Sequence, residues 1–299
     1  MPLAPRPVLR SAPATRVVVV VMDGLRADLV GDPRFPELAA LRAESAHTLD
    51  ATTVLPAVTA AAMTSLLTGV TPAIHGMDTD KFRVPRPRFD LTPLPRLIER
   101  AGMPTFGAMG QVPWIFRPLA RRLVAQLGMR DVVFAGANAH ALIAASMPAL
   151  RAQRSGFALL HWPEADALGH AHGWLSRPYL AAVQRMDHAL GALRRELAAQ
   201  DHDRTLLVVV ADHGGGGRVP THHDSAHPLD ATIPILLHGA GARPMVLAAG
   251  HTLLDVPATV LWALGIDVPT WYAGSPIAAP FAGVVADAIT RPPVALAVA

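Results

Sequence analysis

The sequence predicts an α/β protein in which a mostly parallel central sheet lies between two layers of helices, a three-layer αβα sandwich. Strand-like and helix-like segments alternate along the chain, which is typical of parallel sheets covered by helices. The strand-like runs, such as VVVVVM and LLVVVA, are continuously apolar, as expected of strands buried on both faces. Hydrophobic residues make up 51% of the 299 residues, enough for a sizeable core.

Each element is predicted from its own local pattern. Apolar and β-branched runs predict strands at residues 17–22, 105–109, 157–162, 206–211 and 233–237. Helical periodicity, with glycine at several ends, predicts helices at residues 36–45, 59–67, 94–101, 138–153, 177–199 and 256–264. We therefore expect one catalytic domain over residues 1–299, with its core at about 16–278.

Two segments show no clear period. Residues 78–92 and 110–135 are expected to be irregular and to form a cap over the functional site. The tail beyond Pro280 is rich in Ala, Val and Pro and is expected to be peripheral.

Composition excludes several classes of function. The net charge of +3 comes from 26 basic and 23 acidic residues without a dense basic run, so no nucleic-acid binding is indicated. The chain has no cysteine, which excludes disulfides, thiolate metal sites and a sulfatase nucleophile made from cysteine. The first residues lack the apolar stretch of a signal peptide, and residues 17–22 are too short to span a bilayer. We expect a cytoplasmic protein with no membrane association.

Acidic residues and histidines follow the predicted strands. Because the carboxyl ends of parallel strands meet at one edge of a sheet, these side chains are expected to converge there. Each has an ordinary alternative, since an Asp often caps a helix or a glycine-rich loop and a His-rich loop can simply be solvated. Their joint placement predicts ligands for a hydrolytic pair of metal ions: Asp23, Asp166, His170, Asp212, His213 and His223.

A candidate nucleophile lies in the segment LPAVTAAAMTSLLTG. Thr59 follows an extended stretch and begins a predicted helix, where free N–H groups and the helix dipole favour a phosphate. A hydroxyl at this point can attack phosphorus when a metal ion lowers its proton affinity. The alternative is that Thr59 only caps the helix. Thr64, Ser65 and Thr68 fall inside or at the far end of the helix and are poorer candidates.

Six segments occur in an order that resembles a known superfamily. They are VVVVVMDGLRADL, LPAVTAAAMTSLLTGVTPAIHG, PEADALGHAHG, VVVADHGGGGR, HHDSAHPLDATIPILLHG and LLDVPATVLWALGIDVPTWYAGSPI. Together they resemble the alkaline phosphatase superfamily, and most closely its nucleotide pyrophosphatase/phosphodiesterase-like branch. The resemblance runs from about residue 16 to residue 278 and implies an alkaline-phosphatase-like fold.

The resemblance implies two divalent metal ions, most commonly zinc, with manganese or iron as alternatives. One ion would be held by Asp23, Asp212 and His213 together with the oxygen of Thr59. The other would be held by Asp166, His170 and His223. Counting back seven residues from Asp230 favours His223 over His222, but two extra residues near Val219 leave this choice open.

One position departs from the family pattern. The family's phosphate-contacting Asn would fall at Asp80, and a carboxylate there repels a phosphate unless it is protonated or offset by a cation such as Lys81. A substrate that carries an amino group is an alternative explanation. Candidates for an aromatic substrate slot are Phe82, Trp114 and Phe116.

The predicted activity is hydrolysis of a small phosphate ester or nucleotide. The resemblance implies cleavage of phosphodiester or nucleotide pyrophosphate bonds through a phosphothreonine at Thr59. A phosphomonoesterase or phosphonate hydrolase would share the same core. A metal-dependent phosphotransferase or mutase and a non-catalytic metal-binding relic are the remaining alternatives.

Overall fold

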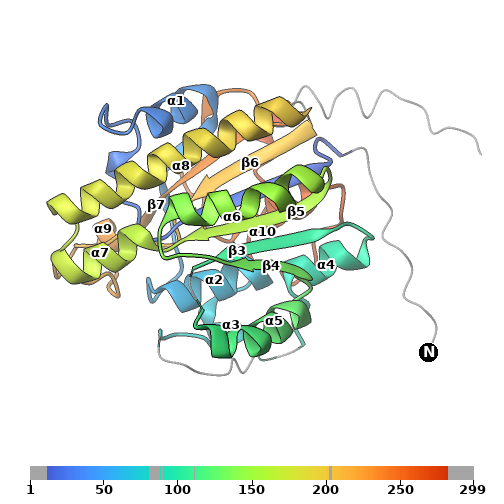
Figure 1. The fold of residues 1–299 in the computed structure, drawn as a ribbon, viewed down its shortest axis with the longest axis horizontal. Coiled ribbons are helices and arrows are strands. Elements are labelled where there is room, and N and C mark those ends of the chain that lie inside the picture. The colour runs from blue at the N-terminus through green and yellow to red at the C-terminus, as the bar shows by residue number, and fades with distance from the viewer. Residues whose placement is uncertain (1–11, 81–87, 89, 111, 202–203, 282–299) are drawn as a thin grey trace, which may run out of the picture.

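An eight-stranded sheet forms the middle of the molecule in the computed structural model, which describes residues 12–80, 88, 90–110, 112–201 and 204–281 (Figure 1). The strands follow in space as β4-β3-β5-β1-β6-β7-β2-β8, and in this described part only β7 runs against the others. Their bounds are β1 (Arg16–Met22), β2 (Ala46–Thr52), β3 (Thr105–Met109), β4 (Asp131–Phe134), β5 (Gly156–Trp162), β6 (Thr205–Val210), β7 (Thr232–Gly239) and β8 (Met245–Val246).

Helices cover both faces of this sheet (Figure 1). The α-helices are α1 (Pro36–Glu44), α2 (Thr59–Thr68), α3 (Pro72–His75), α4 (Leu94–Arg100), α5 (Arg117–Gln126), α6 (Ala139–Ala152), α7 (Glu164–His172), α8 (Arg177–Asp201), α9 (Pro228–Ala231) and α10 (Asp255–Ala263). Short 3-10 helices are η1 (Ala27–Leu29), η2 (Trp114–Phe116) and η4 (Ala279–Phe281). Helices α1, α6 and α8 pack together on one face, and α2, α4 and α10 pack together on the other. The predicted αβα sandwich is confirmed.

The core is built on strands that are buried on both faces. Every residue of β1 and β6 is buried, as their continuous apolar runs predict. Arg16 is buried at the start of β1, but its guanidinium donates to Gln200 Oε1 and to the Leu150 carbonyl, both at 2.9 Å. Asp187 of α8 accepts from the backbone N–H of Leu38 at 2.7 Å and so fixes the N-terminal end of α1 against α8.

Some elements differ from the expectation. Residues 110–135 are not irregular throughout, because they contain η2, α5 and the edge strand β4. Strand β2 was not predicted, since its sequence AHTLDAT alternates between buried and partly exposed residues and has no apolar run. None of the helices in the part of the chain that the structure describes is long and apolar enough to cross a bilayer.

The topology brings the predicted site residues to one edge of the sheet. Strands β1, β5, β6 and β2 are parallel to one another, so their carboxyl ends lie at the same edge. Asp23 follows β1, Asp166 lies in α7 just after β5, Asp212 follows β6, and Thr59 begins α2 after β2. Because β7 is antiparallel, its first residue lies at this edge too, close to the loop that carries His223.

Candidate metal centre

A glycine turn links the ends of the three central strands. Gly24 follows β1 with a positive φ of 69°, a conformation that favours glycine. Its N–H donates to Asp212 Oδ1 at 3.2 Å, and the N–H of Asp166 donates to the Asp23 carbonyl at 3.1 Å. A Cβ on Gly24 would lie 3.0 Å from both Cα and Cβ of Asp166. The turn therefore holds Asp23, Asp166 and Asp212 close together.

The first candidate ligand group consists of Asp23, Asp212 and His213. Their donor atoms lie within 4.8 Å of one another, and all three residues are buried. His213 Nε2 is 3.3 Å from Asp23 Oδ1 and 3.5 Å from Asp212 Oδ2. His213 Nδ1 lies 2.8 Å from the carbonyl of Gly214, which fixes the ring with Nε2 toward the carboxylates.

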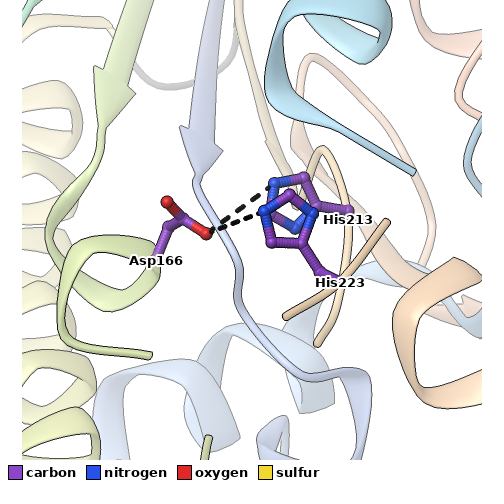
Figure 2. Close-up of side chains that lie close together, drawn as sticks. All are labelled: Asp166, His213 and His223. Atoms are coloured by element: carbon purple, nitrogen blue, oxygen red, sulfur yellow. Dashed lines mark ion pairs between the residues drawn. The ribbon is translucent and has the colours of Figure 1, made fainter. Parts of the chain in front are cut away.

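The second predicted group, Asp166, His170 and His223, also comes together. Asp166 Oδ1 is 3.5 Å from Nε2 of both His170 and His223, and these two Nε2 atoms are 3.0 Å apart. Asp166 and His223 additionally form a compact group with His213. Figure 2 shows Asp166 facing the rings of His213 and His223, which are stacked with centroids 3.7 Å apart. The two groups therefore adjoin each other.

The structure separates the two neighbouring histidines of the THHD segment. His223 is buried, and its Nδ1 lies 2.6 Å from the Ala57 carbonyl, which directs Nε2 toward Asp166. His222 is exposed and contacts Thr221 Oγ1 through Nδ1 at 3.0 Å. The geometry thus places His223, and not His222, among the candidate ligands.

The two His/Asp groups are consistent with a bimetallic site. Asp166 Oδ1 and Asp212 Oδ2 are buried atoms without a hydrogen-bond partner in the described chain, as expected of oxygens that bind a cation instead. Imidazole nitrogens and carboxylate oxygens suit zinc, manganese and iron alike. The residues present therefore fit two divalent ions.

Burial and crowded charge shift the pKa values of the metal-free cluster. Burial, followed by the negative charge of Asp23, raises the pKa of Asp166 to about 8 and that of Asp212 to about 6. Burial alone would lower the pKa of His213, but Asp212, Asp23 and Asp166 outweigh it and raise the value to about 9. Burial and the charge of His213 lower the pKa of His223 to about 4. The charged forms of Asp166 and Asp212 are thus favoured when positive charge lies nearby.

Thr59 lies beside the first ligand group. Its Oγ1 is 3.1 Å from His213 Nε2 and 3.4 Å from Asp23 Oδ1. Thr59 is the first residue of α2, and the cap position is Val58, with no side-chain cap bond. The capping alternative is therefore wrong. Thr64 and Thr68 donate to carbonyls one turn back, so their hydroxyls are engaged within the helix.

Asp80 reaches the same helix end. Its Oδ1 accepts a hydrogen bond from the N–H of Ala60 at 2.9 Å, next to Thr59. Its charge also contributes, after burial and Asp23, to the raised pKa of Asp166. The loop that leads to Asp80 is tied to α2 because Ser65 Oγ lies 2.9 Å from His75 Nε2.

The remaining pocket candidates are not gathered at this centre. Lys81 and Phe82 lie outside the described residues. Trp114, in η2, is 79% exposed, and Phe116 is 55% exposed. Nothing in the structure joins these two side chains to the ligand groups.

His161 is a site residue that the sequence did not reveal. It lies in β5, and its Nε2 is 3.0 Å from Asp23 Oδ2. The one available signal was a polar residue inside the apolar run FALLHW. That signal does not tell whether the side chain faces a helix layer or the site.

Comparison with known families identifies the chain. A model of the type I phosphodiesterase/nucleotide pyrophosphatase family matches residues 17–90 and 113–238, more than half of the chain. The chain belongs to this family. The matched ranges contain Thr59, Asp80 and all six predicted ligands. The family consists of metal-dependent phosphoester hydrolases.

Similar proteins support the fold. A phosphopentomutase from Methylobacterium sp. (strain 4-46) is 35% identical over 91 residues, which are 30% of this chain and 20% of that protein. The match thus spans only about a fifth of that relative's length. An alkaline phosphatase superfamily structure from Vibrio parahaemolyticus has a TM-score of 0.67 at 18% identity, covering 90% of this chain and 72% of that one.

Murine ectonucleotide pyrophosphatase/phosphodiesterase 5 is a third similar protein. The TM-score is 0.65 at 16% identity, covering 87% of this chain and 97% of that one. That structure is of an inactive variant, in which a threonine is replaced by alanine, in complex with AMP. At such identities the likeness establishes an alkaline-phosphatase-like fold.

Proposed function

We propose that this protein is a two-metal phosphodiesterase in which Thr59 is the nucleophile. The observation that carries the proposal is the position of Thr59 Oγ1, 3.1 Å from His213 Nε2 and 3.4 Å from Asp23 Oδ1, at the start of α2. The hydroxyl is not used as a helix cap, and both neighbours belong to a candidate ligand group. A hydroxyl held among metal ligands is placed for attack on a bound phosphate.

Two ions fit the residues present, with zinc as the first choice. Asp23, Asp212 and His213 would hold one ion, and Asp166, His170 and His223 the other. When bound, the ions supply positive charge that stabilises the phosphoryl oxygens and lowers the proton affinity of the attacking group. With this positive charge beside them, the three carboxylates of Asp23, Asp166 and Asp212 would no longer repel an anionic substrate.

The reaction follows from the position of the hydroxyl as two displacements. In the first, Thr59 Oγ1 forms a bond to phosphorus and the bond from phosphorus to the leaving oxygen breaks. The Thr59 hydroxyl loses a proton, and the departing alcohol gains one. In the second, a water oxygen forms a bond to phosphorus, the bond from phosphorus to Thr59 Oγ1 breaks, and Thr59 regains a proton as the water loses one. The net reaction consumes one water and yields an alcohol and a phosphate monoester.

Asp80 favours a diester over a monoester as the substrate. Three ligand carboxylates and Asp80 carry four negative charges, which two divalent ions just neutralise. A diester adds one negative charge beside Asp80, whereas a monoester dianion adds two. Because the repulsion scales with charge, Asp80 discriminates against the monoester. The structural likeness to a protein solved with AMP makes nucleotide diesters and pyrophosphates the first substrates to test.

The test compares zinc-loaded turnover of bis-p-nitrophenyl phosphate with that of p-nitrophenyl phosphate. We expect a higher kcat/KM for the diester, and loss of both activities in Thr59→Ala at unchanged metal content. Thr64→Ala is the matched control, because Thr64 lies in the same helix but donates to the Ala60 carbonyl. Wild-type turnover by Thr59→Ala would overturn the role of Thr59, and a monoester preference would favour a phosphatase.

A further inference from the structure

His161 is an unusual residue for its place in the sheet. It lies near the carboxyl end of β5, whose other residues are apolar and buried, and it pairs with Val21 of β1. Its side chain is only 17% exposed. An imidazole in such a place loses hydration, so its polar atoms need partners within the protein.

The partner of this ring is the first ligand carboxylate. His161 Nε2 lies 3.0 Å from Asp23 Oδ2. The other oxygen, Oδ1, lies 3.4 Å from Thr59 Oγ1 and 3.3 Å from His213 Nε2. The two oxygens of Asp23 therefore face different neighbours, one toward His161 and one toward the candidate ligand group.

His161 is not placed as a ligand itself. Neither of the two compact His/Asp groups found in the described residues includes it, although one of them contains Asp23, its close neighbour. Its Nε2 is buried and makes no well-aligned hydrogen bond in the described chain, so its close contact with the Asp23 carboxylate is the polar contact that the ring makes there. The ring is thus aimed at the carboxylate from the side away from Thr59.

We propose that His161 is a positioning residue that orients Asp23, and through it the metal ion and Thr59. Because Asp23 Oδ2 lies 3.0 Å from His161 Nε2, the carboxylate is held with Oδ1 toward Thr59 and His213. This proposal rests on the proposed metal-dependent function. Groups that orient a metal ligand in this way commonly change metal affinity by about 10- to 100-fold when removed.

The experiment compares His161→Phe with His161→Gln. Phenylalanine keeps a ring of similar size but has no donor, whereas glutamine keeps an N–H donor on a flexible chain. His47→Phe is the matched control, because His47 lies in β2 of the same sheet, at the start of the strand and so at the opposite edge. The readouts are the zinc Kd by chelator competition, the visible spectrum of the cobalt-loaded protein, and kcat and KM for the diester.

The expected result is specific to the donor. His161→Phe should weaken the binding of one of the two zinc ions by about 10- to 100-fold, change the cobalt spectrum and lower kcat more than it raises KM. His161→Gln should recover part of each loss, and His47→Phe should resemble the wild type.

Two results would overturn the proposal. One is an unchanged zinc Kd and cobalt spectrum in His161→Phe. The other is equal damage in the Phe and Gln variants, which would indicate a packing role only. Zinc binding and the cobalt spectrum do not depend on turnover. A wild-type protein that binds zinc but hydrolyses no diester would therefore refute the proposed function, and the zinc Kd and cobalt spectrum of His161→Phe would still test the role of His161.

Discussion

Asp80 places a carboxylate beside the proposed nucleophile, at the start of α2. Its carboxylate accepts a hydrogen bond from the N–H of Ala60. This N–H is one of the donors at the start of α2 that would otherwise be available to an anion. It lies close enough to Asp166 for its charge to act on that carboxyl group. The same residue therefore removes one anion-binding donor and adds a negative charge.

Neutralising Asp80 should relax the choice between diester and monoester. Asp80→Asn keeps the size of the side chain, and we expect kcat/KM for p-nitrophenyl phosphate to rise by about tenfold, with a smaller rise for the diester, because the dianion gains more. Asp78→Asn, an equal change of charge two residues away, is the control. A diester/monoester ratio that is the same in Asp80→Asn and wild type would show that Asp80 does not set specificity.

Gly24 should be intolerant of a side chain for two separable reasons. Its φ of +69° costs an alanine about 1–2 kcal/mol, and a Cβ would press on Asp166 at 3.0 Å. Gly102→Ala is the control, since Gly102 has a φ of +81° but no atom within 4 Å of its ideal Cβ. Thermal unfolding should show that both variants lose stability, while zinc titration should show weaker binding in Gly24→Ala alone. Unaltered zinc affinity in Gly24→Ala would contradict this view of the turn.

Most candidate site residues were accessible from the sequence because they directly follow apolar strands. Asp23 and Asp212 are examples, since the end of a buried parallel strand fixes where the next side chain lies. His161 was not accessible, because a residue within a strand can face either helix layer and only the packing decides. The choice between His222 and His223 likewise needed the contact of His223 with the Ala57 carbonyl.

At the scale of elements, helix α7 supplies two of the three residues of the second candidate ligand group. Asp166 and His170 are four residues apart on this helix, so their side chains lie one above the other on one face. Their polar atoms are 3.5 Å apart, with His223 Nε2 completing the group. His172 lies near the end of the same helix but is exposed and makes none of these contacts.

Removal of one imidazole from α7 should empty one metal site. We expect His170→Ala to bind one zinc ion per chain instead of two, and His172→Ala to keep two, because only His170 lies beside Asp166 and His223. Metal analysis after dialysis against trace zinc measures this directly. Equal metal content in the two variants would remove His170 from the ligand set.

Helices and strands were predicted where hydrophobic periodicity is strong, as in β1, β6 and α8. Strands β2, β4 and β8 were missed, since β2 has no apolar run, β4 has only four residues and β8 only two. Helix α7 was only partly foreseen, because Gly169 within DALGH suggests a turn. Whether residues 78–92 and 110–135 act as a cap over the site stays a prediction.

For the whole molecule, the crowded carboxylates link stability to pH when no metal is bound. The folded protein holds protons more tightly than the unfolded chain at Asp166, whose pKa is raised from 3.8 to about 8, and at His213, whose pKa is raised from 6.5 to about 9. A raised pKa contributes stability at low pH that is lost as the pH rises through that window. His223, with a lowered pKa of about 4, acts in the opposite direction only below about pH 6.5.

The Tm of the metal-free protein should therefore fall between pH 6.5 and 8.5, by roughly 5 °C. In this window the folded state still holds protons at Asp166 and His213 that the unfolded chain largely releases, so a rise in pH favours unfolding. Bound zinc replaces those protons, so the zinc-loaded protein should show little of this dependence. Thermal unfolding of stripped and loaded protein at both pH values measures the effect. A Tm of the stripped protein that rises with pH would contradict the charge distribution described here.

The proposed mechanism transfers the phosphoryl group through Thr59 in two displacements. The stereochemistry at phosphorus is the most direct test of this mechanism. The measurement is hydrolysis of a chiral phosphorothioate diester in ¹⁸O-labelled water by the zinc-loaded protein, followed by assignment of configuration at phosphorus. Two in-line displacements predict net retention. Inversion would mean that water attacks the substrate directly, and would contradict a covalent intermediate on Thr59.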